Sequence, residues 1–307
     1  MSGIYIHIPF CKKACHYCNF HFSTIKNSKS SFIKAVCQEL KLRSSEYLSK
    51  EIQTIYFGGG TPTVLEVAEI KIILDIVYDF YNVSTNSEVT IEANPDDLDL
   101  DTIIALSKTK INRLSIGIQS FHDLDLIAMN RVHNAEDAKQ CLKSASSYFD
   151  NITIDLMYGM PAMTLDLWRQ NLQTAFNFGV KHLSCYAMTV EPLTALEHFI
   201  QKGSHPPMDD ELAAQHFKVL LEETSKQGLT HYETCSFGVP DYFSRHNTSY
   251  WLGKSYLGIG PSAHSFDGKK RSWNIANNYK YIKSIEASVL PSVSEILTIE
   301  NRFNEYI

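Results

Sequence analysis

The chain has 307 residues, seven of them cysteine, and a formal net charge of −6. Its 44% hydrophobic and 20% charged residues are typical of a globular protein with a core of good size. Because the chain is acidic and has no Lys/Arg run, its composition argues against nucleic acid or an anionic membrane as the main surface partner. The length suits one large α/β domain or two smaller ones.

The N-terminus enters a strand-like run at once, without the charged, apolar and small-residue regions of a secretory leader. No stretch is long and apolar enough to form a transmembrane helix, so we expect no integral membrane segment. Four cysteines are scattered through helix-like or strand-like runs and are expected to be buried small hydrophobes, namely Cys37, Cys141, Cys185 and Cys235. This usage predicts a reducing, cytoplasmic location.

Strand-like and helix-like runs alternate about six times in the first 190 residues. The expected strands are residues 4–8, 54–57, 88–93, 113–118, 152–156 and 182–188. The expected helices are residues 30–43, 67–81, 100–107, 135–148 and 165–178. Repeated βα units indicate an α/β fold with a parallel sheet. Polar or glycine-rich clusters follow nearly every strand, which favours a partial (β/α)6 TIM-type barrel over an open doubly wound sheet.

The pattern changes after residue 188. Residues 209–227 predict a long amphipathic helix, and residues 232–237, 244–251 and 256–264 are rich in aromatics, glycine and histidine. We expect these three segments to be loops that close over a flat ligand. The predicted division is therefore a barrel over residues 1–190 and an α+β extension or lid over residues 191–307.

Three cysteines, Cys11, Cys15 and Cys18, follow the first expected strand in a CxxxCxxC pattern. A [4Fe–4S] cluster normally has four Cys ligands, so three thiolates would leave one iron with an open coordination site. The alternative is a zinc site that adds His16 or His7, although zinc sites usually have two paired Cys/His knuckles and only one is present.

Polar residues at the ends of successive strands are expected to meet at one mouth of the barrel. Gly58, Gly59 and Gly60 allow the backbone to approach a ligand closely, and we expect their amides to face the cluster. The remaining strand-end candidates are Thr61, Glu92, Asp96, Gln119, Arg131 and Asp155. A single carboxylate at a strand end is more often a helix cap, but several that converge indicate a ligand site.

The motifs IYIHIPFCxxxCxYC, GGGTPT, IEANPDD, LSIGIQSF and IDLMYGMP resemble those of the oxygen-independent coproporphyrinogen III oxidase-like family of radical S-adenosylmethionine (SAM) proteins. The resemblance runs from Gly3 to about residue 307. It implies a [4Fe–4S] cluster on the three cysteines, with SAM on the open iron. By the same resemblance, SAM is contacted by Tyr5, Tyr17, Gly59, Gly60, Thr61, Glu92, Gln119, Arg131, Asp155, Thr189 and His264.

Two features favour the HemW-type haem chaperone branch of that family. The oxidases have a further Cys two residues after the last cluster thiol, where this chain has Phe20. Residues 246–251 match the HNxxYW signature of the haem chaperones, which implies haem as cargo and acceptor haemoproteins as partners. His246 is the expected axial ligand, and Tyr250, Trp251 and Tyr256 are expected to stack on the porphyrin.

Two alternatives stay open at this point. His246 and Trp251 can also be packed residues of a lid, and the whole chain can be a coproporphyrinogen III oxidase that decarboxylates two propionates. The family also has a C-terminal helical domain after the NEYI motif, so we expect this chain to be truncated or an unusually short member.

Overall fold

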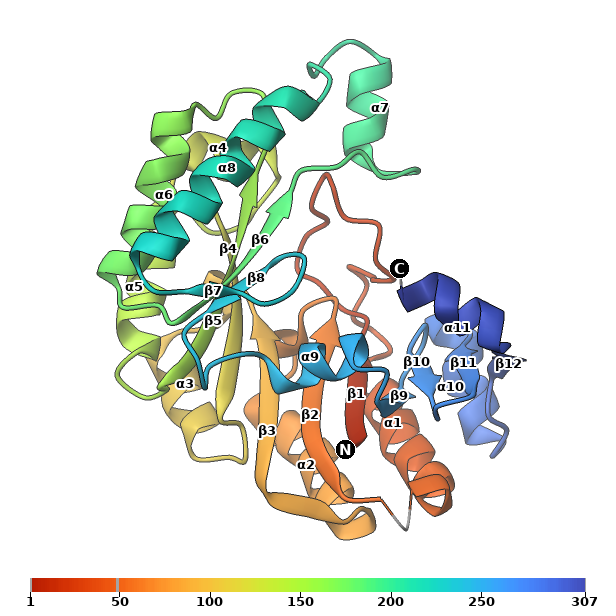
Figure 1. The fold of residues 1–307 in the computed structure, drawn as a ribbon. Helices are drawn as coiled ribbons and strands as arrows, with labels where there is room; N and C mark the ends of the chain where they lie inside the picture. The colour runs from red at the N-terminus through yellow and green to blue at the C-terminus, as the bar shows by residue number, and fades with distance from the viewer. Residues whose placement is uncertain (1, 48–49, 307) are drawn as a thin grey trace.

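The computed structural model describes residues 2–47 and 50–306, so the predicted limit at residue 307 lies outside it. Six parallel strands are consecutive neighbours: β1 (Ser2–Ile8), β2 (Ile52–Gly59), β3 (Val83–Ala93), β4 (Arg113–Gln119), β5 (Asn151–Tyr158) and β6 (His182–Ala187). The helices between them are α1 (Lys29–Arg43), α2 (Val67–Phe80), α3 (Leu100–Ser107), α4 (Asp123–Ala128), α5 (Ala135–Ala145) and α6 (Leu165–Asn177). The order of these six strands never reverses, so they have no switch point of a doubly wound sheet. The predicted partial (β/α)6 barrel is confirmed (Figure 1).

The second part of the chain extends the same sheet at both edges. It contains α7 (Ala195–Gln201), α8 (Asp210–Lys226), β7 (Thr230–His231), β8 (Ser236–Gly238), α9 (Arg245–Trp251), β9 (Ser255–Ile259), β10 (His264–Phe266), β11 (Lys270–Asn274), α10 (Asn278–Glu286), β12 (Ser292–Ile296) and α11 (Ile299–Tyr306). Strand β9 pairs in parallel with β1, and β8 pairs antiparallel with β6. The twelve-stranded order is β12-β11-β10-β9-β1-β2-β3-β4-β5-β6-β8-β7.

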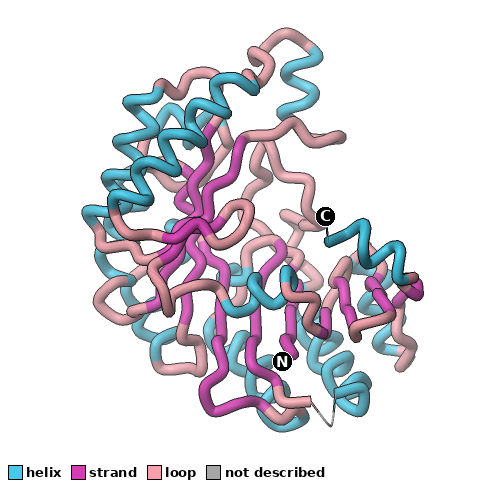
Figure 2. Tube along the Cα trace, viewed as in Figure 1, coloured by secondary structure: helices cyan, strands magenta, loops and turns pink. Residues whose placement is uncertain are grey.

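The expectation that residues 232–264 are loops over a ligand is therefore wrong for much of this segment, which forms α9, β8 and β9 (Figure 2). The aromatic content misled the prediction, because aromatic residues also suit short strands such as β8 and β9. The expected helix at residues 209–227 is confirmed as α8. The domain limit at residue 190 stays a prediction, and the sheet continues across it.

Side chains of successive strand residues point alternately into the barrel and toward the helices that cover it. In the middle of β2, Ile55 and Phe57 are buried in the apolar core, whereas Thr54 and Tyr56 belong to the opposite set. Each strand from β1 to β5 has the same division, and register brings the polar sets of neighbours together, as in Thr54 beside Glu88. The interior of the barrel is therefore polar and suited to hold charged ligand groups.

The extension is attached to α1 by a buried carboxylate. Glu39 is fully buried and accepts hydrogen bonds from Gly260 N (2.9 Å), Asn274 Nδ2 (2.7 Å) and Tyr281 Oη (2.7 Å). Its Oε1 also lies 3.5 Å from Arg43 Nη1. These contacts join the β9–β11 region and α10 to the first helix of the barrel. None of the described helices has both the length and the apolar character needed to cross a bilayer.

Candidate functional site

The three cysteines of the motif lie on the loop between β1 and α1, above the C-terminal ends of the strands. Backbone hydrogen bonds close this loop at its base, from Cys11 N to Ser23 O (3.0 Å) and from Ser23 N to Pro9 O (2.9 Å). All three thiols are free and line one cavity of about 540 Å³. The predicted meeting of the cysteine loop and the strand ends is confirmed.

The donor arrangement favours a cluster over a single metal ion. Across residues 2–47 and 50–306, no three His, Cys, Asp or Glu side chains converge closely enough to hold one ion. Of the two imidazoles of the zinc alternative, His7 has both ring nitrogens hydrogen bonded, Nε2 2.9 Å from His21 O and Nδ1 3.2 Å from Tyr5 Oη. His16 uses only Nδ1, which lies 2.9 Å from Ala128 O. Each thiolate of a cubane cluster binds a different iron, so the thiols need not meet at one point.

A chain of hydrogen bonds connects two of the thiols through barrel residues. Thr61 Oγ1 donates to Cys11 Sγ at 3.5 Å and accepts from Asn94 Nδ2 at 3.1 Å. Arg131 Nη2 donates to Asn94 Oδ1 at 2.5 Å, and its Nη1 donates to Cys15 Sγ at 3.3 Å. Asn94 was not among the predicted site residues, although its place directly after β3 is the same signal that identified Glu92.

Two half-buried carboxyls form the acidic part of the cavity. Glu92 accepts hydrogen bonds from Tyr56 Oη (2.8 Å) and Gly59 N (3.2 Å), while Asp155 lines the cavity from β5. Burial raises the pKa of Glu92 to about 7. Burial, together with the neighbouring Glu92 charge, raises the pKa of Asp155 to about 7. A carboxyl with a pKa near 7 can lose its proton when hydroxyl or ammonium donors of a ligand bind beside it.

Gln119 at the end of β4 combines a strained backbone with an unpaired polar atom. Its φ of 69° lies in the left-handed region that non-glycine residues rarely adopt. Its buried Oε1 has no hydrogen-bond partner among the described residues. A strained residue with an unsatisfied acceptor beside a cavity is typical of a ligand site. The residues therefore fit SAM, which offers an ammonium group and ribose hydroxyls as donors.

Nine of the eleven residues predicted to contact SAM line this cavity: Tyr17, Gly59, Gly60, Thr61, Glu92, Gln119, Arg131, Asp155 and Thr189. The other two do not. Tyr5 lies deeper, with its ring stacked on Tyr56 at 6.1 Å. His264 is exposed on β10 and stacks on Trp273 of β11 at 5.9 Å. The β10–β11 hairpin carries His264 away from the cavity lining.

Two further expectations at the strand ends need correction. The amides of the glycine segment do not face the thiols, because Gly60 N and Thr61 N donate to Ile8 O (2.8 Å) and Phe10 O (2.7 Å). They fix the start of the cysteine loop instead. Asp96 does not line the cavity either, and its carboxylate pairs with Lys12 Nζ at 3.0 Å. Asp96 thus holds the cysteine loop rather than a ligand.

The HNxxYW segment forms α9 and lies at the other end of the strands. Glu88, near the start of β3's paired region, accepts from the backbone N of both Arg245 (3.0 Å) and His246 (3.0 Å). The His246 ring is 1% exposed, with Nδ1 2.8 Å from Thr54 Oγ1 and Nε2 2.7 Å from Tyr250 Oη. Both ring nitrogens are occupied, so in this conformation His246 is a packed residue and not an available axial ligand.

The outer side of α9 is different. Tyr250 and Trp251 are exposed, and their predicted role in stacking on a porphyrin stays a prediction. His246 stacks on Tyr56 at 5.1 Å, and Tyr56 in turn donates to Glu92. The HNxxYW helix therefore supports the cavity from below through one tyrosine.

A partial barrel with three thiols above polar strand ends has the architecture of a radical SAM protein, and the Radical SAM superfamily matches residues 5–175. The haem chaperone HemW of Bacillus subtilis is 34% identical over 296 residues, which cover 95% of this chain and 78% of that protein. HemW of Mycobacterium tuberculosis is 31% identical over 294 residues, covering 94% of this chain and 75% of that protein. The chain therefore belongs to the radical SAM superfamily and, within it, to the HemW family.

The fold has a close counterpart among solved structures. Coproporphyrinogen III oxidase (HemN) from Escherichia coli superposes with a TM-score of 0.85, covering 98% of this chain and 73% of that chain. The two sequences are 23% identical. This likeness establishes the shared architecture of the barrel and its extension.

Proposed function

We propose that this protein binds haem and passes it to acceptor haemoproteins, using a radical SAM core that holds a [4Fe–4S] cluster and SAM. The observation that carries the proposal is the 34% identity with a haem chaperone over 95% of the chain. The HNxxYW helix, residues 246–251, agrees with it. Seven free thiols support a reducing compartment, which we take to be the cytoplasm.

The cavity residues divide naturally between the two cofactors. Cys11, Cys15 and Cys18 would hold the cluster, and the strand-end groups would hold SAM. Glu92 and Asp155 supply acceptors for ribose hydroxyls and the ammonium group, while Arg131 supplies a donor for the carboxylate. A bound cluster of this kind supplies one electron to SAM.

The alternative function is oxidative decarboxylation of coproporphyrinogen III. Phe20 argues against it, because this side chain is 70% exposed and lines the cavity mouth where the oxidases have a further thiol. A phenyl ring offers neither a proton nor an electron pair for the chemistry of a thiol. The structural likeness to HemN concerns the fold and does not favour this activity.

The deciding experiment uses anaerobically reconstituted protein in two parallel assays. Haem titration should give a saturable Soret spectrum, whereas incubation with coproporphyrinogen III, SAM and a reductant should give no protoporphyrinogen IX. Steady turnover, with haem binding no tighter than to serum albumin, would favour the oxidase instead. The Phe20→Cys variant restores the thiol that the oxidases have at this position and should leave haem binding unchanged.

A further inference from the structure

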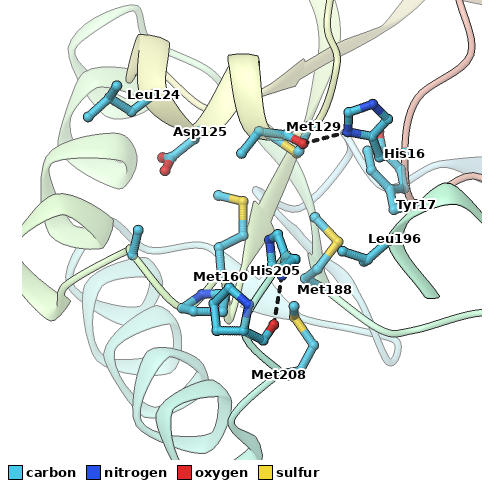
Figure 3. Close-up of a pocket in the computed structure, with 14 residues that line it drawn as sticks. His16, Tyr17, Leu124, Asp125, Met129, Met160, Met188, Leu196, His205 and Met208 are labelled. Carbon is cyan, nitrogen blue, oxygen red and sulfur yellow. Dashed lines mark hydrogen bonds between the residues drawn. The ribbon is translucent and has the colours of Figure 1, made fainter. Parts of the chain in front are cut away.

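A second cavity, of about 150 Å³, shares Tyr17 with the SAM cavity but is otherwise separate from it (Figure 3). Four thioethers line it, from Met129 at the end of α4, Met160 after β5, Met188 after β6, and Met208 before α8. Apart from Asp125, Tyr17 and two imidazoles, the lining is aliphatic or proline. The cavity therefore combines a soft, apolar surface with nitrogen donors.

The two imidazoles are His16 and His205, and they differ in orientation. His16 uses Nδ1 to contact Ala128 O, and Figure 3 shows its other nitrogen pointing away from the methionines. His205 uses Nδ1 to contact Pro206 O at 2.7 Å, and its ring stands between Met160 and Met188 with Met208 below it. Its Nε2 has no hydrogen-bond partner among the described residues. His205 thus presents a free nitrogen donor among thioethers.

We propose that this Met-lined cavity receives one edge of the haem, with His205 Nε2 as a ligand of the haem iron. The inference rests on the proposed function and gives it a site. Histidine and methionine are the usual neutral ligands of haem iron, and an apolar lining suits the vinyl and methyl edge of a porphyrin. His246 cannot compete in this conformation, because both of its nitrogens are hydrogen bonded.

The cavity is too small to enclose a whole macrocycle, so the rest of the haem must lie against the surrounding surface. Leu124 on α4 lines the cavity and is 80% exposed. Leu193 is 99% exposed and has a φ of 65°, in the segment between Glu191, which lines the SAM cavity, and Leu196, which lines this one. Both leucines are exposed apolar side chains that the part of a macrocycle outside the cavity can contact.

The cysteine loop forms one wall of the site, which connects haem to the radical SAM centre. His16 N donates to Met129 O (3.2 Å), and Leu196 N donates to His16 O (2.8 Å). Asn130 Nδ2 also donates to Ala14 O at 2.7 Å. The loop that carries the thiols is therefore bonded to both α4 and the start of α7, on either side of the proposed haem position.

The test is haem titration of the reconstituted full chain, followed by Soret absorption and by electron paramagnetic resonance of the ferric complex. His205→Ala should shift the Soret band and weaken haem binding about tenfold, which corresponds to about 1.4 kcal/mol. His205→Gly with added imidazole should recover the parent spectrum, because free imidazole can replace the missing ligand. His198→Ala is the matched control, since His198 is exposed on α7 and does not line the cavity.

Four results would overturn the inference. If His205→Ala binds haem with the parent spectrum and affinity, His205 is not the ligand, and the proposed function still stands. If His246→Ala alone changes the spectrum, the HNxxYW histidine ligates after rearrangement of α9. Stoichiometric Cu(I) binding that His205→Ala abolishes without affecting haem would assign the cavity to a soft metal ion. If the parent protein binds no haem at all, this inference and the proposed function fall together.

Discussion

Arg131 and Cys15 are joined by an Nη1–Sγ contact of 3.3 Å, although 116 positions separate them in the sequence. The guanidinium is held in place by Gly117 O at 2.8 Å and by Asn94. A positive charge that donates to a cluster thiolate stabilises the more negative, reduced state of the cluster. This relationship connects the strand ends to the electron chemistry of the site.

Arg131→Ala should lower the reduction potential of the reconstituted cluster by up to roughly 100 mV. A hydrogen bond to a charged group contributes about 1.5–3 kcal/mol, and about 59 mV is a tenfold change in a one-electron equilibrium. The measurement is a redox titration without SAM, followed by electron paramagnetic resonance. Arg169→Ala, in a surface pair with Asp166, is the control and should leave the potential unchanged. An unaltered potential in Arg131→Ala would show that the contact does not tune the cluster.

Loss of Cys15 should abolish the brown colour of the anaerobically reconstituted protein. The parent should contain roughly four irons and four sulfides per chain, because three thiolates can hold a [4Fe–4S] cluster. Cys235→Ala should retain both, since Cys235 lies outside the cavity. Metal and sulfide analysis is the measurement, and stoichiometric zinc without sulfide would contradict the radical SAM assignment.

SAM affinity should rise between about pH 6 and pH 8. The pKa values of Glu92 and Asp155 are each raised to about 7, so both carboxyls lose their protons in this range and become full acceptors. The stability of the ligand-free chain changes with pH in the opposite direction to the SAM affinity. The folded state keeps protons that the unfolded state has lost above its ordinary carboxyl pKa, so stability falls as pH rises toward 7.

Calorimetric SAM titrations across this pH range provide the measurement for the affinity. Glu92→Gln should weaken binding by about 1–3 kcal/mol at pH 8, because a partner is left unsatisfied, and should flatten the pH dependence. Asp166→Asn, on the exposed start of α6, should change neither. An affinity for SAM that is constant from pH 6 to pH 8 would exclude ionisation of this pair on binding.

Glu39→Ala should destabilise the chain by about 3–5 kcal/mol, the usual effect of removing one partner of a buried ionic network. It removes the acceptor of the Tyr281 hydroxyl and one of the acceptors of Asn274 and Arg43. Glu39→Gln should be milder because it keeps the shape and one acceptor. Urea unfolding measures both, with Asp75→Ala in the exposed Lys71–Asp75 pair as a control expected within about 0.5 kcal/mol of the parent. Equal stability of all three variants would mean that the extension does not depend on this network.

Sequence patterns predicted the barrel and most of its cavity because both depend on local regularities. Alternation in the strands and polar residues after each strand are visible in the chain, and they placed Glu92, Gln119 and Asp155 correctly at the cavity. The contacts of Asn94 and Asp96 were not predictable, since these positions are only two residues apart and have different partners. Asn94 contacts Arg131 at the cavity, whereas Asp96 contacts Lys12. The left-handed backbone of Gln119 likewise leaves no mark in the sequence.

The extension was harder to predict for a different physical reason. Strand β9 is stabilised by pairing with β1, and its residues are more than 250 positions away from their partners. A motif such as HNxxYW identifies a family branch, but it does not reveal whether its side chains are buried or exposed. The buried hydrogen bonds of His246 to Thr54 and Tyr250 depend on tertiary packing, and they became visible only in the structure.

Haem transfer to an apo-haemoprotein tests most directly whether this radical SAM protein carries haem. The reconstituted, haem-loaded protein is mixed with apomyoglobin, and formation of the holo-acceptor spectrum is followed against a haem–albumin donor at the same haem concentration. We expect stoichiometric transfer that is faster than from albumin. Retention of haem by the protein, or transfer no faster than from albumin together with conversion of coproporphyrinogen III to protoporphyrinogen IX, would contradict it.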